Sequence, residues 1–255
     1  MQSNEIVQEV LNALTVVSER AMPRILSQIC RDEGSPFFGC ADRNWWHYKM
    51  RDFPSIILQQ SGATLHAAQG LKSFSDCSNE LKKLTTASCK FWNERAIRFR
   101  SFEEYYPWEE GYPPLAFSTL STVRMVAEDV IAIDHVIPGL KVASRQLLNR
   151  FESQAANQQV AGLAALSWIH KTSPSLVSLA EINTLIEKTL QLQDEEGWFN
   201  EYGGPDLGYL SVTIDCLWDS FDAIGDIRLI ESAKKALNFL DEMTYNTYGD
   251  SIGMH

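Results

Sequence analysis

The stretch SLAEINTLIEKTL, residues 178–190, decides the fold class. Ser178 is followed three residues later by Glu181, which is the capping-box pattern of a helix start. Apolar residues then recur at steps of three and four, the spacing that places side chains on one face of an α-helix. These residues are Leu179, Ile182, Leu185, Ile186 and Leu190. The segment therefore predicts an amphipathic helix.

The same helical spacing continues along most of the chain. A first amphipathic helix is expected over residues 6–17, and Pro23 is expected to open a second one, because proline is tolerated in a first helical turn. Further helices are predicted over 54–70, 79–96, 114–131, 139–150, 157–171, 209–222 and 227–243. No useful run alternates with a period of two. The sequence thus predicts an all-α fold in one domain, 1–255, with the helices of 1–35 at its periphery.

Composition limits the classes of partner. The 255 residues include 22 Lys and Arg against 33 Asp and Glu, a formal net charge of −11, which argues against nucleic-acid binding. No apolar run approaches the ~18 residues that a membrane span needs, and the first residues lack the pattern of a signal peptide. We therefore expect a cytoplasmic protein without a transmembrane segment. The sequence has no HExxH motif, no paired His/Cys spacing and no Gly-rich phosphate loop, so neither a metal nor a nucleotide cofactor is expected.

Two loops share a pattern at one constant offset of 97 residues (199 − 102). The matching pairs are Phe102/Phe199, Glu104/Glu201, Tyr105/Tyr202, Gly111/Gly208, Tyr112/Tyr209 and Leu120/Leu217. The interval holds four predicted helices, which corresponds to two helical hairpins of about 48 residues each, near the length of known helical repeats. Both loops are then expected to face one rim of a stack of hairpins.

Aromatic residues are concentrated in three connections, at 40–54, 102–114 and 195–209. Stacked hairpins can form an open solenoid or close into an α/α toroid around a funnel. Aromatic side chains in loops indicate packing on a rim or contact with a ligand, since loops are usually polar. This concentration favours the α/α toroid.

Three segments carry a family resemblance: DRNWWHYKMRDFPS (42–55), NQQVAGLAAL (157–166) and DEEGWFNEYGGPDLGYLSVTID (194–215). They resemble uncharacterised α/α-toroid proteins of bacterial surface-polysaccharide gene clusters, those for O-antigen and capsule, and the likeness runs from about residue 40 to 255. The spacing of Gln193, Glu196, Gly197 and Trp198 is also similar to a repeat motif of terpenoid cyclase and prenyltransferase toroids. The resemblance implies a carbohydrate ligand and a role in surface-polysaccharide metabolism.

The chain also departs from these families. A longer C-terminal portion usually follows a loop like residues 248–253, and a closed ring of six hairpins needs about twelve helices where about ten are predicted. The ring is then incomplete, or a protein partner or second copy supplies the remainder. The cyclase DxDD motif is absent from the sequence, and Asp215-Cys216 does not match a prenyltransferase zinc set.

Paired carboxylates among aromatic rings suit glycoside chemistry, in which one acid protonates the leaving oxygen and rings stack on sugar faces. The carboxylate candidates are Glu201, Glu104 and Asp206. Glu201 has a structural alternative, which is to cap a helix or to accept backbone N–H bonds in the Gly-Gly-Pro turn. The sugar-platform candidates are Trp45, Trp46, Tyr112, Trp198, Tyr202 and Tyr209. Asp215 is a further candidate, with Asp219 one turn on, provided that their helix lines the funnel.

A second cluster, at residues 42–49, suits a polysaccharide lyase, which needs a base for the proton next to a uronate carboxylate and a cation to neutralise that carboxylate. His47 is the candidate proton carrier, and Arg43, Tyr48 and Lys49 are candidates for substrate contact. The structural alternative is a charged network that anchors the loop. The sequence therefore predicts a glycosidase-like or lyase-like protein, with a terpenoid cyclase, a prenyl-binding protein or a noncatalytic subunit as alternatives.

Overall fold

The computed structural model describes residues 2–40, 61–100, 102 and 110–246. Within these ranges the chain is all-α, with no strand and only isolated bridges between loop residues. The helices are α1 (Gln2–Leu26), α2 (Ser61–Gln69), α3 (Ser78–Phe99), α4 (Tyr112–Ala127), α5 (Ile137–Asn149), α6 (Ala156–Thr172), α7 (Leu179–Leu190), α8 (Leu207–Ile224) and α9 (Ile227–Asn246). The all-α prediction is confirmed.

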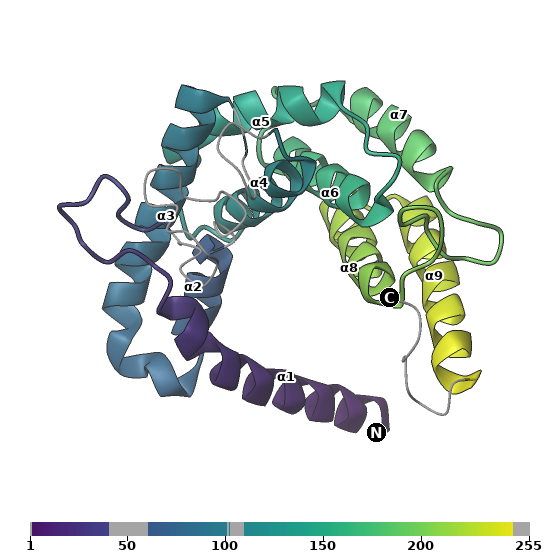
Figure 1. The fold of residues 1–255 in the computed structure, drawn as a ribbon, viewed down its shortest axis with the longest axis horizontal. Helices are drawn as coiled ribbons and strands as arrows, with labels where there is room; N and C mark the ends of the chain where they lie inside the picture. The colour runs from purple at the N-terminus through teal and green to yellow at the C-terminus, as the bar shows by residue number, and fades with distance from the viewer. Residues whose placement is uncertain (1, 41–60, 101, 103–109, 247–255) are drawn as a thin grey trace.

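The helices form two layers that curve into an open arc, with α2, α4, α6 and α8 on the inside and α3, α5, α7 and α9 on the outside (Figure 1). Successive inner helices α4, α6 and α8 pack side by side. Helix α1 leaves the arc at α2 and runs across its open side (Figure 1). Each inner helix is followed by an outer one, so the starts of the inner helices share one rim.

Helix α6 is central because it is buried nearly all round, against α4 on one side and α8 on the other. Small residues permit this close packing. At Gly162 an added Cβ would collide with the hydroxyl of Tyr112 and approach Leu147 Cδ2 at 3.2 Å. The sequence NQQVAGLAAL therefore makes a helix that is narrow enough to be packed from both sides.

The main core lies between the two layers and includes Trp92, Leu115, Leu140, Leu163 and Leu217. Some of its buried polar groups pair across the two layers, as expected of groups removed from water. The indole N–H of Trp92 on α3 donates to Ser118 Oγ on α4 at 2.8 Å. These contacts join neighbouring hairpins into one packed body.

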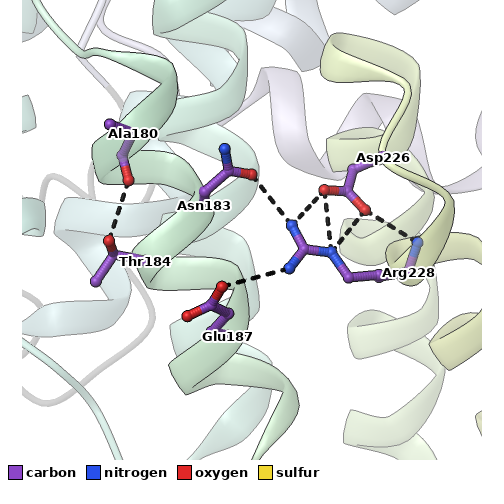
Figure 2. Close-up of polar contacts among 6 residues, drawn as sticks. All are labelled: Ala180, Asn183, Thr184, Glu187, Asp226 and Arg228. Carbon is purple, nitrogen blue, oxygen red and sulfur yellow. Dashed lines mark hydrogen bonds and ion pairs between the residues drawn. The ribbon is translucent and has the colours of Figure 1, made fainter.

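The outer helices α7 and α9 are joined by a polar cluster around Arg228 (Figure 2). Its guanidinium Nη2 donates to Asn183 Oδ1 at 3.1 Å and to Asp226 Oδ2 at 2.5 Å, and its Nη1 lies 3.8 Å from Glu187 Oε1. The Arg228 guanidinium lowers the pKa of the Asp226 carboxyl. The cluster is partly exposed, so it fixes the register of the two helices more than it stabilises the fold.

One helix prediction was wrong: Pro23 does not open a second helix. Pro23 lies inside α1. Its carbonyl accepts the N–H of Ser27, the residue that follows the end of the helix. The proline ring removes the backbone donor that would otherwise bond the carbonyl of Glu19. Glu19 is close to the surface, where water can replace that bond, so the helix continues through the proline.

The capping box predicted at Ser178 is confirmed, and its contribution can be tested. Ser178 Oγ accepts the N–H of Glu181, and Glu181 Oε2 accepts the N–H of Ser178 at 2.8 Å. We expect Ser178→Ala to lower the free energy of unfolding by about 0.5–2 kcal/mol, because a first-turn N–H loses its partner. Urea denaturation measures the change. Thr184→Ala on the same helix, where an exposed hydroxyl bonds the Ala180 carbonyl (Figure 2), serves as the control and should change it by less than about 0.5 kcal/mol.

Candidate functional site

The candidate site lies on the rim where α6 and α8 begin, and the loop between α7 and α8 builds it. Gly197 in this loop has a φ of 108°, and an added Cβ would lie 2.5 Å from the carbonyl oxygen of Lys235 on α9. The loop is also held by Gln193, whose Nε2 donates to the Ser232 carbonyl at 3.0 Å. Only glycine combines this backbone conformation with this close approach. The contacts of Gln193 and Gly197 thus hold the first part of the loop against α9, and the residues that follow lie on the rim.

Glu201 caps helix α6 from outside that helix. The N-cap residue Ala155 has no side-chain acceptor, and Glu201 Oε1 instead accepts the N–H of Asn157 at 2.7 Å. The carbonyl of Asn200 accepts the N–H of Ala156 at 3.1 Å. First-turn amides of a helix lack partners within the helix, and a carboxylate there is also favoured by the helix dipole. The structural alternative for Glu201, a helix cap, is therefore what the structure contains.

The second carboxylate oxygen of Glu201 is different, because Oε2 is buried and has no hydrogen-bond partner. The side chain is 7% exposed, and burial raises the pKa of Glu201 to about 7, with smaller contributions from the charges of Asp206 and Glu152. The bond from Asn157 acts in the opposite direction. A pKa of about 7 leaves Glu201 protonated in part of the molecules near neutral pH, and the protonated form is the state that a general acid requires.

Asp206 lies at the start of α8, where its Oδ1 accepts the N–H of Tyr209 at 2.8 Å. It is the N-cap of that helix. The two candidate carboxylates are therefore both bound to helix starts on one rim, and the Asp206 charge reaches Glu201 strongly enough to raise the pKa of Glu201.

Two tyrosines on this rim are exposed. Tyr202 is 70% exposed with a φ of 54°, and its hydroxyl accepts a bond from Gln158 Nε2 at 3.3 Å. Tyr209, on the first turn of α8, is 47% exposed. The turn between them is open, since a Cβ added at Gly203 or Gly204 would meet nothing within 4 Å. A ligand can therefore approach the turn and both rings.

Tyr112 does not fit the predicted sugar platform, whereas Trp198 is partly exposed. Tyr112 is buried under Gly162, its hydroxyl donates to Gln159 Oε1 at 3.2 Å, and the Arg150 guanidinium lies 5.4 Å from its ring centroid. Its surroundings leave no face of the ring open to a ligand. Burial raises the pKa of the Tyr112 hydroxyl. Trp198 is half-buried against the core, and its indole N–H donates to Glu196 Oε2 at 3.2 Å. We reassign Tyr112 to packing, and Trp198 stays a candidate for ligand contact.

Asp215 is exposed on α8, whereas Asp219 one turn on is half-buried and pairs with Arg124 of α4. Arg124 also bonds Glu128 at 2.9 Å, and its guanidinium lies 4.5 Å from the ring centroid of Trp168 on α6. Burial raises the pKa of Asp219 and the Arg124 charge lowers it. Thus Asp219, rather than Asp215, faces the neighbouring inner helices.

A pocket of about 510 Å³ lies beside this network, between α2, α4 and Asp219 of α8. Its wall is apolar at Phe117 and Leu120 and polar at Ser121 and His66. No motif in the sequence predicts this pocket. The spacing of Arg124 and Glu128 was a readable signal for an ion pair on one helix, but nothing in the sequence indicates that α8 supplies the second carboxylate.

Seven of the predicted site residues lie outside the described residues. They are Arg43, Trp45, Trp46, His47, Tyr48, Lys49 and Glu104. The structure thus brings together Glu201, Asp206, Tyr202 and Tyr209, and it leaves the lyase-like cluster as a prediction.

No group of three or more His, Cys, Asp or Glu residues that could hold a metal ion occurs in the described ranges. In the same part of the chain, no helix is long and apolar enough to cross a membrane. Comparison of the chain with protein-family models, with curated proteins and with solved structures gives no match. The function is therefore argued from the geometry of the site.

The raised pKa of Glu201 predicts how stability depends on pH. Its carboxyl has a pKa of about 7 in the folded protein against 4.5 as the ordinary value, so the folded state binds the proton more tightly. The stability that Glu201 contributes is full below pH 4.5 and is lost as the pH rises to about 7. Glu201→Gln keeps an oxygen for the Asn157 N–H but cannot titrate.

We expect the difference in unfolding free energy between wild type and Glu201→Gln to fall between pH 4.5 and 7 and to be flat above that range. Urea denaturation at several pH values measures it. Glu201→Ala removes the acceptor as well, so it should be less stable than Glu201→Gln at every pH. A difference between wild type and Glu201→Gln that does not change with pH would contradict the assignment of a raised pKa.

Proposed function

We propose that this protein binds a carbohydrate at the rim where α6 and α8 begin, and that it acts on surface polysaccharide as a glycoside hydrolase-like or lyase-like enzyme. The observation that carries the proposal is one protonatable carboxyl, Glu201, on a rim with two exposed tyrosines. Tyrosine rings stack on the apolar faces of sugars, and their hydroxyls bond to sugar hydroxyls. Neutral or amino sugars suit the acidic charge of the chain best.

In a hydrolase-like reaction Glu201 would act as the general acid. A carboxylic acid with a pKa near 7 can donate its proton to the leaving glycosidic oxygen. Asp206 is the second carboxyl group of the pair, which supports the developing positive charge or activates water. The available oxygen is Oε2, because Oε1 is bound to α6. Since Oε2 is covered, the role requires the turn at Gly203 and Gly204 to move aside when the substrate binds.

A role in bacterial surface-polysaccharide metabolism in the cytoplasm rests on the resemblance of the three segments described above. The same resemblance carries the finer description of the fold. We propose that the open arc is part of an α/α toroid, with the rim of α6 and α8 at the mouth of its funnel. The order of alternating inner and outer helices supports this arrangement.

A terpenoid cyclase or prenyl-binding protein is less well supported. Such a site needs an apolar or π-lined depth that stabilises a carbocation. The pocket between α2 and α4 instead contains the fixed cation Arg124, bound to two carboxylates. A noncatalytic subunit is the stronger second candidate, because α1 exposes an apolar face that a partner can cover.

The proposal is tested with a panel of neutral and amino-sugar oligosaccharides, by calorimetry for binding and by mass spectrometry for products. We expect Tyr209→Ala and Tyr202→Asn to weaken glycan binding at least tenfold while leaving the unfolding free energy nearly unchanged. Asparagine is chosen at position 202 because it tolerates a positive φ. Trp218→Ala is the matched control, since Trp218 is 50% exposed on α8 away from its first turn and should bind as wild type does.

Glu201→Gln should retain binding and lose turnover, because it keeps the shape of the carboxyl without its proton. Binding of glycans without products for the wild type would reduce the proposal to a noncatalytic carbohydrate-binding role. If wild-type protein neither binds nor converts any glycan in the panel, the proposal is rejected.

A further inference from the structure

Helix α1 is the longest helix in the described part of the chain and the least covered. All residues from 4 to 17 are exposed, although the helix has a broad apolar face. Side chains that are about half to two-thirds exposed on this face are Ile6, Val7, Val10, Leu11, Leu14 and Val17. A continuous apolar stripe of this length is rare on the surface of a monomer and marks an interaction site.

The far end of the same helix is anchored in its own chain. Met22 and Leu26 are buried with Leu65 of α2 and with Leu81 and Leu84 of α3, in a small core separate from the main one. The projecting part therefore extends a helix whose last turns are fixed, and Figure 1 shows it running away from α2 across the open side of the arc. The side chains of the stripe on this projecting part are exposed.

The charges beside the stripe indicate which partner fits. Glu9 and Arg20 are separated by slightly more than three full turns at about 3.6 residues per turn, so both lie along the same edge of the apolar face. When two identical helices pack face to face in antiparallel orientation, equivalent edges meet. In this orientation, residues of the two helices lie opposite each other when their numbers have the same sum. If Glu9 lies opposite Arg20, the centre of the contact falls between Leu14 and Thr15.

Antiparallel pairing of two copies thus places Glu9 of each helix opposite Arg20 of the other, and it places Leu14 at the middle of the apolar contact. Parallel pairing of two copies instead brings opposite edges of the face together, so Glu9 and Arg20 would lie beside the neutral edge of Gln8 and Thr15 and gain no ion pair. Opposite charges that face each other across such an edge are favourable. The face is therefore complementary to itself in one orientation, as a two-fold interface requires.

We propose that two copies of this chain form a dimer through antiparallel packing of their α1 helices. The dimer covers the stripe from Ile6 to Val17 and adds two Glu9–Arg20 ion pairs at its edges. It does not depend on the proposed carbohydrate activity.

Light scattering on the full chain tests the proposal. At a protein concentration of about 50 µM, we expect wild type to have a mass of twice 28.8 kDa. Leu14→Glu should have a mass near 28.8 kDa. Asn12→Glu, on the opposite face of α1, is the matched control and should remain a dimer. Leu14 is 57% exposed in the single chain, so Leu14→Glu should leave the fold intact and keep the far-ultraviolet circular dichroism of wild type.

The orientation is tested by exchanging the charges. Glu9→Arg and Arg20→Glu should each weaken the dimer, and the double variant should restore it, because the pair is re-formed with reversed sign. A monomeric wild type, including one that binds phosphatidylcholine vesicles through α1, would overturn the proposal. So would a Leu14→Glu variant that is still dimeric. If neither single charge variant weakens the dimer, the antiparallel arrangement is wrong.

Discussion

The first turn of α6 depends on acceptors that come from another part of the chain. Its amides bond to the carbonyl of Asn200 and to the carboxyl of Glu201, while Ala155 at its N-cap contributes no side-chain acceptor. Because α6 packs against both α4 and α8, the position of its first turn sets the position of the inner layer. The rim that carries the candidate site is thus held together by the residue that would perform its chemistry.

This arrangement joins stability and function at one carboxyl. Oε1 of Glu201 needs to accept a bond, whereas Oε2 is buried without a partner and favours the protonated form. A protonated carboxyl satisfies both conditions, because its carbonyl oxygen can accept while its hydroxyl carries the proton. The cost of burying the group is reduced by neutralising it. The proposed acid role therefore uses a protonation state that the packing of the rim already favours.

The helices could be predicted from the sequence because their apolar spacing and start signals are local, as at Ser178 and Glu181. Pro23 was misassigned because a proline near the surface leaves an unpaired carbonyl where water can bond to it. The acidic rim was partly predictable, since Glu201 and Asp206 stand in a distinctive loop. The pairing of Arg124 with Asp219 was not, because it depends on how far the inner helices curve. Periodicity does not specify that curvature.

The cap on α6 also orders events during synthesis. The Asn157 amide and the Glu201 carboxyl are 44 positions apart in the chain, so the start of α6 stays open on the ribosome until the segment after α7 has emerged. A nascent chain that ends before residue 200 exposes the unbonded amides of that first turn. The segment around residues 200 and 201 is therefore needed to complete the first turn of a helix in the middle of the protein. A product truncated before it would expose the unpaired amides of α6.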